Sequence, residues 1–580
     1  MRGPKWAGAV RKEQKRWKEL IEPLKDEIAV LEKELECGVA SAHMMFFRSV
    51  DGLIEGGMGA AGSIRWKLFN SDLVHESEKI WANGTDVWAV EDVGDGAELY
   101  AIGLHTRKST HHGPVWQHKG VAPSFAIVGG RCYCLEVKKK LVYWRLVSWN
   151  AHTGKDRRVH YEEPDYRYNL EIIQNADSHA YVRRQSGGKQ DCFMITEKGP
   201  ESVLEGISQS SRRFIFGTKE GEYLVWTEEE GWKASEGLDV KLPAFTRAVP
   251  EQLDTRRGLL VTVWLGCRTL WSISRSKGPV ILWKGYGSVL MDPLGGPYLR
   301  LTMPGKDCYW WSLSQGPGPC PGQEAGRCLM ATSADGTDIP YYLLTPSSPR
   351  TNGLLVIGYG AYGLPTGYMT HRWEPLRRRG WAIAIGLWRG GGDHTPQWAD
   401  AGRCFGRSLV LEDAEAVVKA AQKATGVPAT RTVLYGRSAG GLWVGGLLTS
   451  GVVKGAAGYM EVCYLDAFQT MTNRALPLTE IEADEFGLPD RDISEFVNVA
   501  SWSPMERIPA KGLPGVFQIV RSALNDSQVY AYESMKWITR CKSSSAYLAI
   551  EGDQGHFTRG PVLHKQQAQD LAVLIKNLSS

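Results

Sequence analysis

The chain has 580 residues, and its 68 lysines and arginines nearly balance 64 aspartates and glutamates, for a formal net charge of +4 at pH 7. Such a balance is not typical of a nucleic-acid-binding protein, and we expect no nucleic-acid partner. No run approaches about 18 apolar residues, so we also expect no transmembrane helix and no membrane partner.

The eleven cysteines include no CxxC pair and no zinc-ligand spacing. Cys132 and Cys134 would share one face of a strand, and we interpret them as small buried hydrophobic residues rather than metal ligands. We therefore expect no metal and no cofactor. The odd cysteine count and an N-terminus that is charged but lacks the apolar stretch of a signal peptide indicate a cytoplasmic protein.

Residues 1–44 are predicted to form a helical segment. Apolar residues recur there at steps of three and four and form one stripe: Trp17, Leu20, Leu24, Ile28, Leu31 and Leu35. Pro23 marks either a first-turn position or a kink. The stripe lasts less than three heptads, so packing against the same chain is favoured over a coiled coil with a partner helix.

Residues 45–326 change to short alternating apolar runs joined by glycine-bearing or charged turns, which is typical of hairpins. The first strands of successive hairpins recur at intervals of roughly 40 to 50 residues, as in a β-propeller of four-stranded blades. They centre near Trp88, Tyr133, Tyr181, Tyr223, Val261 and Leu299, and the runs MMFFRSV and IRWKLFN are candidates for a seventh unit. The pattern thus predicts an all-β propeller of about seven blades.

The Gly/Pro-rich stretch QGPGPCPGQEAGR at 315–327 marks a domain boundary. In residues 327–580, short apolar runs alternate with helix-like segments, which predicts a mostly parallel sheet covered by helices. The apolar runs are GLLVIG, WAIAIGLW, TVLYG, AAGYMEV, GVFQIV and AYLAIEG.

Ser438 lies in LYGRSAGG, a G-x-S-x-G motif that follows an apolar run and precedes a helix-like one. This is the strand–turn–helix setting that presents a nucleophilic serine in α/β-hydrolases. The flanking glycines allow a sharp turn, and the helix N-terminus offers free N–H groups to an oxyanion. A simple glycine-rich turn is the alternative interpretation.

A nucleophilic serine needs a base, and the base needs a carboxylate that orients it. Only His556 and His564 follow Ser438, and His556 is favoured because it comes directly after a predicted strand. Asp526 follows the preceding strand and is the favoured carboxylate, whether or not it also caps a helix. Asp466, one strand earlier, is the weaker alternative.

Several sequence blocks in this order resemble the prolyl oligopeptidase family, and most closely its oligopeptidase B branch. They are ATSADGTDIPYYLL, GYGAYG, RGGGDHTPQWADAG, GRSAGG, LPLTEIEADEFGLP, SWSPMERI, NDSQV and GDQGH. The resemblance covers most of 328–580 and implies a serine peptidase with a seven-bladed propeller domain over an α/β-hydrolase domain. The family usually has RGGGE where this chain has RGGGD, and the sequence after GDQGH also departs from its pattern.

The resemblance implies roles for individual residues. Ser438, Asp526 and His556 would form the triad, and the Tyr359 hydroxyl and the Ala439 N–H would bind the oxyanion. Without the resemblance, we would interpret Tyr359 as a packed aromatic residue at a strand end.

Four acidic residues lie close together in LPLTEIEADEFGLP: Glu480, Glu482, Asp484 and Glu485. Such a cluster is ordinarily a solvated loop. The resemblance implies instead that Glu482 and Asp484 receive a basic side chain on the P1 residue, and a carboxylate pair suits a guanidinium or an ammonium. The prolyl-specific branch has an arginine where this chain has Gln528.

We therefore expect an oligopeptidase that cleaves short peptides after Arg or Lys, because a propeller would hinder folded proteins from reaching Ser438. The expected protein is a monomer or a dimer. Two alternatives remain: a related prolyl- or acylaminoacyl-peptide hydrolase or esterase with the same triad, and a propeller-based binding protein with a catalytically weak site.

Overall fold

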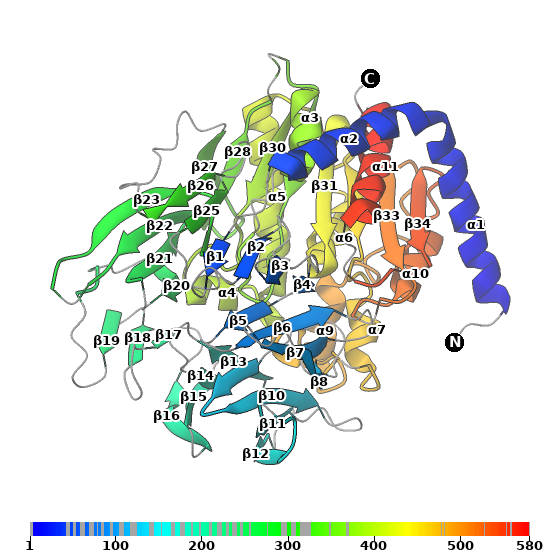
Figure 1. Cartoon of the computed structure of the whole chain (residues 1–580). Coiled ribbons are helices and arrows are strands. Elements are labelled where there is room, and N and C mark those ends of the chain that lie inside the picture. Colours follow the sequence, from blue (N-terminus) through cyan, green and yellow to red (C-terminus); the bar gives the residue numbers. More distant parts are fainter. Residues whose placement is uncertain are drawn as a thin grey trace. The chain divides into compact units, whose positions relative to one another are not determined.

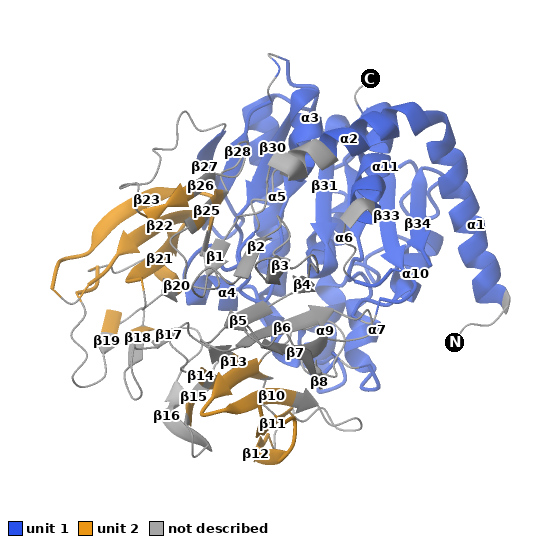
Figure 2. Cartoon of the chain, viewed as in Figure 1, with its two compact units in different colours: residues 1–41, 304–307, 323–580 blue, residues 42–303, 308–322 orange. Residues whose placement is uncertain are grey.

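A computed structural model describes residues 4–41, strand segments between 47 and 313, and 326–578 except 347, 349, 367–370, 477, 481, 527, 553 and 557–559. The chain divides into two compact units (Figure 2). Unit 1 comprises residues 1–41, 304–307 and 323–580, and unit 2 comprises residues 42–303 and 308–322. The predicted division into 1–44, 45–326 and 327–580 stays a prediction.

In the part of unit 2 that the structure describes, antiparallel strands form seven separate sheets (Figure 1). Neighbouring strands in each sheet follow one another in the sequence, as hairpin turns require. Every predicted hairpin centre, from Trp88 in β6 to Leu299 in β25, falls within a strand. Their closure into a propeller stays a prediction.

The strands of the first four sheets are β1 (Phe47–Ser49), β2 (Ile54–Met58), β3 (Ile64–Leu68), β4 (His75–Ser77), β5 (Lys79–Ala82), β6 (Asp86–Asp92), β7 (Ala97–Gly103), β8 (Ser109–Trp116), β9 (Phe125–Val128), β10 (Arg131–Val137), β11 (Trp144–Asn150), β12 (Arg158–Glu162), β13 (Asn169–Gln174), β14 (Ala180–Ser186), β15 (Lys189–Thr196) and β16 (Gly199–Ile207). The other three sheets contain β17 (Arg212–Phe216), β18 (Tyr223–Thr227), β19 (Gly231–Ala234), β20 (Val249–Asp254), β21 (Leu259–Trp264), β22 (Cys267–Ser272), β23 (Val280–Tyr286), β24 (Ser288–Met291), β25 (Tyr298–Thr302) and β26 (Tyr309–Ser312).

Cys132 and Cys134 lie on one face of β10, in a buried cluster with Phe125, Val147 and Trp149. Their sulfur atoms are 3.7 Å apart, and neither cysteine is in a disulfide. The two cysteines therefore pack as small hydrophobic residues, which is the interpretation that the sequence favoured.

Unit 1 contains an eight-stranded sheet in the order β27-β28-β30-β29-β31-β32-β33-β34. The pairs from β30 to β34 are parallel, and β28 joins antiparallel to β27 and β30. The strands are β27 (Gly326–Thr332), β28 (Asp338–Leu344), β29 (Gly353–Ile357), β30 (Trp381–Gly386), β31 (Thr432–Arg437), β32 (Ala457–Glu461), β33 (Gln518–Ala523) and β34 (Ala546–Glu551). All six predicted apolar runs are strands of this sheet, and the predicted parallel architecture is confirmed.

Helices connect these strands and pack on them (Figure 1). They are α3 (Glu374–Arg378), α4 (Pro396–Asp400), α5 (Arg407–Thr425), α6 (Gly441–Ser450), α7 (Ala467–Thr472), α8 (Ala483–Phe486), α9 (Ile493–Trp502), α10 (Ala531–Cys541) and α11 (Gly560–Leu578), with 3₁₀ turns η4 (His371–Trp373), η5 (Cys404–Gly406), η6 (Ala429–Arg431) and η7 (Ser438–Gly440).

The N-terminal segment belongs to unit 1. Helices α1 (Pro4–Ile21) and α2 (Lys25–Ser41) are separated by the 3₁₀ turn η1 (Glu22–Leu24). Pro23 lies in the first turn of η1, which is one of its two predicted roles. α1 packs on the edge strand β34, and α2 packs on α11 (Figure 1). The Trp17 indole is buried and donates to Gln569 Oε1 at 3.4 Å. The predicted packing of the stripe against the same chain is therefore confirmed. In the part of the chain that the structure describes, no helix is long and apolar enough to span a bilayer.

Truncating the apolar stripe of α2 should destabilise unit 1. Leu31 has an exposed fraction of 0%, so Leu31→Ala removes buried contacts and is expected to lower the free energy of unfolding by about 2–5 kcal/mol. Val30, the preceding residue, is 51% exposed, so Val30→Ala should change it by no more than about 0.5 kcal/mol. Urea unfolding followed by tryptophan fluorescence measures both, and equal effects would contradict the packing of this helix.

Candidate active site

Ser438 lies in a sharp turn between a buried strand and a buried helix. β31 ends at Arg437, η7 begins at Ser438, and α6 follows from Gly441. Ser438 has a φ of 53°, in the left-handed region that residues with side chains rarely adopt. A strained serine between a strand and a helix is the geometry of a nucleophile turn, in which the hydroxyl is presented at the end of the sheet.

The glycines around Ser438 are required by close approaches of the backbone. A Cβ atom on Gly436 would lie 2.2 Å from the carbonyl oxygen of Gly440, and one on Gly441 would lie 2.5 Å from the sulfur of Cys463. Neither position has room for a side chain, because atoms that close overlap. The small residues therefore let the strand turn directly into α6.

Ser438, His556 and Asp526 form one chain of hydrogen bonds. His556 Nε2 is 3.1 Å from Ser438 Oγ, and His556 Nδ1 is 2.7 Å from Asp526 Oδ2. The other carboxylate oxygen of Asp526 accepts from the backbone N–H groups of Gln528 and Val529, each at 2.9 Å. Both the histidine and the aspartate are buried, so this geometry is held away from bulk water.

The two alternatives lie elsewhere. The Asp466 carboxylate is ion-paired with Lys536 Nζ at 2.5 Å rather than with the imidazole. His564 lies within helix α11. The geometry thus brings together the residues that the sequence favoured.

Asn525 ties the aspartate loop to the histidine loop. Its backbone N–H donates to the Gln554 carbonyl, and its side-chain amide donates to the Gly552 carbonyl, both at 3.1 Å. These loops follow β33 and β34, which are parallel neighbours, so their ends meet at the same edge of the sheet. Asp526 and His556 are therefore held together by backbone contacts as well as by their own hydrogen bond.

Tyr359 lies beside Ser438 because β29 and β31 are parallel neighbours that end at the same edge. The Trp443 indole of α6 donates to the Gly358 carbonyl at 3.1 Å, which fixes the GYG segment to the helix that follows the serine. A Cβ atom on Gly358 would lie 1.9 Å from the Trp388 ring, which explains that glycine.

The Tyr359 hydroxyl is a hydrogen-bond donor that does not ionise near neutral pH. Burial raises the pKa of Tyr359 to about 12, and the negative charges of Glu482 and Glu485 act in the same direction. The positive charge of Arg437 and a hydrogen bond with the Ser438 side chain oppose this rise in pKa. Tyr359 is thus placed next to the serine as a neutral phenol.

The four acidic residues of the 480–485 segment have different surroundings. Glu480 is ion-paired with Arg474, and Glu485 is ion-paired with Arg407 and with Arg403. Glu482 Oε1 instead accepts a hydrogen bond from the Tyr362 hydroxyl at 2.8 Å.

The backbone carbonyl of Asp484 accepts a hydrogen bond from the Cys404 thiol at 3.2 Å. The predicted pairing of Glu482 with Asp484 around a basic side chain stays a prediction.

Burial raises the pKa of Glu482 from 4.5 to about 7, and the charges of Glu485 and Glu533 contribute to the rise, while the Tyr362 hydrogen bond opposes it. Burial away from water disfavours the ionised form of a carboxyl group, and a nearby cation favours it. Glu482 is therefore suited to bind a positively charged group.

Tyr464 is a residue next to Ser438 that the sequence did not predict. Its backbone N–H donates to the Ser438 carbonyl at 3.0 Å, and its ring packs 5.1 Å from the Phe486 ring. Its buried hydroxyl has no hydrogen-bond partner among the described residues, and the charge of Glu482 acts on it. A buried hydroxyl without a hydrogen-bond partner is uncommon in folded proteins. No motif signals it, because only the fold brings this hydroxyl near Glu482.

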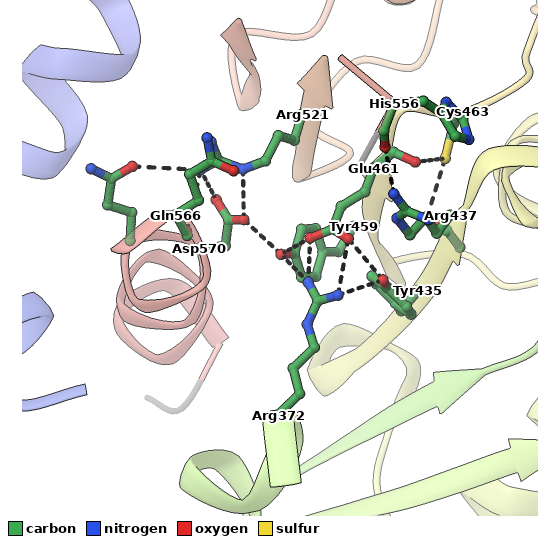
Figure 3. A network of polar contacts seen from close by, with 12 residues as sticks. Arg372, Tyr435, Arg437, Tyr459, Glu461, Cys463, Arg521, His556, Gln566 and Asp570 are labelled. Atoms are coloured by element: carbon green, nitrogen blue, oxygen red, sulfur yellow. Dashed lines mark hydrogen bonds and ion pairs between the residues drawn. The ribbon is translucent and has the colours of Figure 1, made fainter. Parts of the chain in front are cut away.

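A network of buried charges lies next to the site (Figure 3). Glu461 accepts from Tyr435 at 2.8 Å and from Tyr459 at 2.6 Å, and it is ion-paired with Arg372. Although burial raises its pKa, Arg372 holds the pKa of Glu461 down to about 2, so this carboxylate stays ionised.

The network extends from β32 to α11 and β33. Tyr459 contacts Asp570 at 2.6 Å, and Asp570 is ion-paired with Arg521 of β33 at 2.6 Å. At its other end, Arg437 donates to the backbone carbonyl of His556 at 2.5 Å (Figure 3).

Comparison with protein-family models matches residues 367–579 to the prolyl oligopeptidase family. These residues form a prolyl oligopeptidase family domain. The family consists of serine peptidases, and the resemblance noted in the sequence is confirmed.

Curated relatives match about two fifths of the chain. Protease 2 of Moraxella lacunata is 26% identical over 261 residues, which are 43% of this chain and 37% of that protein. A prolyl endopeptidase-like protein of Rattus norvegicus is 31% identical over 235 residues, 39% of this chain and 32% of the relative. The chain thus matches about a third of the length of these relatives.

Solved structures match nearly the whole chain. Oligopeptidase B from Leishmania major aligns with a TM-score of 0.78 and 16% identity, over 99% of this chain and 92% of that structure. Oligopeptidase B from Trypanosoma brucei, solved with covalently bound antipain, gives a TM-score of 0.78 and 17% identity over 99% and 92%. At this identity the likeness establishes a shared fold.

Adding a methyl group at the serine turn of the family domain should destabilise it. Gly436→Ala places a Cβ atom against the Gly440 carbonyl, and we expect a loss of about 1–3 kcal/mol of folding free energy, measured by urea unfolding. Gly8→Ala is the matched control, because a Cβ there meets nothing within 4 Å and Gly8 lies within α1. Its substitution should be neutral or stabilise by about 0.5–1 kcal/mol. A stable Gly436→Ala variant would contradict the tight turn.

Proposed function

We propose that the chain is a serine oligopeptidase that hydrolyses short peptides after arginine or lysine, through a triad of Ser438, His556 and Asp526. The observation that carries the proposal is the continuous hydrogen-bonded chain from Ser438 Oγ through both nitrogens of His556 to Asp526. It lies at a nucleophile turn within a serine peptidase family domain.

In the proposed mechanism, Ser438 Oγ attacks the peptide carbonyl while His556 Nε2 takes its proton. The Asp526 carboxylate accepts from Nδ1–H and stabilises the imidazolium that forms. The imidazolium then gives its proton to the leaving amine, which leaves an acyl-enzyme. Water, activated by the same imidazole, releases the acid and regenerates Ser438.

The oxyanion of the tetrahedral intermediate would be bound by the Tyr359 hydroxyl and the Ala439 N–H. Support comes from the position of the phenol beside Ser438 and from its raised pKa, which keeps it a donor. Ala439 is the second residue of η7, directly before helix α6, where backbone N–H groups lack helical acceptors. Each such donor is worth about 3 kcal/mol of transition-state stabilisation.

Specificity for a basic P1 side chain would come from Glu482, with Asp484 as the second carboxylate of the predicted pair. Glu482 is supported by its hydrogen bond to Tyr362 and its raised pKa, and by the unpaired Tyr464 hydroxyl nearby. A bound guanidinium or ammonium would offset the desolvation cost of the buried Glu482 carboxylate. It would also donate hydrogen bonds to the carboxylate oxygens.

We further propose that the seven sheets in the described part of unit 2 are blades of a propeller that admits only small peptides, and that the protein works in the cytoplasm. The number of sheets and the fold shared with oligopeptidase B support the propeller.

The proposal is tested by comparing an arginyl amide, a prolyl amide and a short-chain ester as substrates of the full chain. The arginyl amide should be hydrolysed with the highest kcat/KM, and Ser438→Ala should lower kcat by about 10⁶-fold. A fluorophosphonate probe should label the wild-type chain but not this variant. Preference for the prolyl amide or the ester would refute the specificity, and absence of labelling would favour a binding protein.

The affinity for a basic substrate should depend on pH through Glu482. With a pKa of about 7, its carboxyl is mostly protonated at about pH 6 and mostly ionised at about pH 8. KM for the arginyl amide should therefore fall as pH rises across this range, whereas KM for a neutral substrate should not.

Glu482→Gln should raise KM for the arginyl amide roughly 10- to 100-fold and remove its pH dependence. Glu480→Gln is the matched control, because that carboxylate is ion-paired with Arg474 and its loss should leave KM nearly unchanged. An unchanged KM profile in Glu482→Gln would exclude this carboxylate as the P1 site.

A further inference from the structure

Arg437 joins the nucleophile turn to the histidine loop. It is the last residue of β31 and directly precedes Ser438 in the chain. Its guanidinium crosses to the loop after β34 and donates from Nη2 to the backbone carbonyl of His556 at 2.5 Å, as Figure 3 shows. The residue next to the serine thus contacts the backbone of the base.

This contact closes a ring around the reacting atoms. One side is the bond between Ser438 Oγ and His556 Nε2 at 3.1 Å, and the other is the bond between Arg437 Nη2 and the His556 carbonyl. The peptide bond between Arg437 and Ser438 completes it. Asp526 holds the imidazole from the third direction, at Nδ1. The imidazole cannot withdraw from the serine without breaking the arginine contact or rotating away from Asp526.

An oppositely charged residue lies on the strand next to Arg437. Arg437 is paired in register with Glu461 on the parallel strand β32, and its charge helps to keep that carboxylate ionised. Glu461 is fixed in turn by hydrogen bonds from Tyr435 and Tyr459 and by its ion pair with Arg372 (Figure 3). An anion that is fixed by three partners thus lies on the strand beside Arg437.

We propose, on the basis of the proposed function, that Arg437 is a positioning residue that holds His556 at its working distance from Ser438. It does not contact the substrate in this role. Its loss should therefore lower kcat and leave KM nearly unchanged. A shift of about 1 Å between reacting groups lowers rates on the order of 100-fold, so a loss of roughly 10- to 100-fold in kcat is expected.

The test compares Arg437→Ala and Arg437→Met with Arg540→Ala in the full chain. Arg540 is the matched control, because its Nη1 also donates to a backbone carbonyl, that of Met505 at 3.2 Å. Four quantities are measured: the rate at which a fluorophosphonate labels Ser438, kcat and KM for the arginyl amide, and the free energy of unfolding. Both Arg437 variants should slow labelling and kcat 10- to 100-fold with KM within about threefold, and Arg540→Ala should do neither.

The labelling rate in the presence of added methylguanidinium distinguishes a positioning role from a purely structural one. At millimolar concentrations it should restore part of the labelling rate of Arg437→Ala by occupying the vacated space, and it should not accelerate Arg437→Met, whose side chain fills that space. If Arg437→Ala does not fold, Arg437→Met decides the question by its labelling rate in the folded state.

Labelling and kcat within about threefold of wild type in a folded Arg437 variant would overturn the inference, as would an equal loss in Arg540→Ala. Labelling separates this result from a failure of the proposed specificity. A wild-type chain that is labelled but does not cleave the arginyl amide would refute the specificity and still leave the role of Arg437 to be measured by labelling.

Discussion

The parallel pairing of β29, β31, β32, β33 and β34 is the constraint on which the site depends. Parallel strands end at the same edge of a sheet, so the segments that follow them meet there although they are far apart in sequence. Tyr359 follows β29, Ser438 follows β31, and the two remaining triad positions follow β33 and β34. Every hydrogen bond of the proposed triad joins segments that this pairing has already brought together.

Burial then decides what each polar group at this edge can do. Charges with partners stay charged, as Glu461 does beside Arg372, whereas Glu482 has a tyrosine hydroxyl as its partner and its pKa rises to about 7. The same low-dielectric surroundings keep Tyr359 protonated. Burial thus leaves Glu461 an ionised carboxylate, because it is paired with Arg372, and leaves Glu482 a carboxyl whose pKa is near 7.

Prediction from sequence was most complete where local pattern and function coincide. The G-x-S-x-G motif identified the turn at Ser438, because strain, small neighbours and a following helix all appear in consecutive residues. The six apolar runs became strands, since residues buried on both faces of a sheet leave a continuous apolar signal. The first-turn position of Pro23 in η1 also followed from one residue's chemistry. The contacts of Tyr464 and Arg437 could not be predicted, because their local sequence does not indicate which distant residues they meet.

The sequence by itself determined the element types, the chain order of Ser438, Asp526 and His556, and the family that residues 367–579 resemble, because these depend on residue chemistry and spacing along the chain. Only the tertiary structure decided which partner each acidic residue has. Glu480 and Glu485 meet arginines while Glu482, between them, meets Tyr362. Neighbours in sequence were separated in environment because each side chain of a short turn and helix points in a different direction, and the residues that face it come from distant segments.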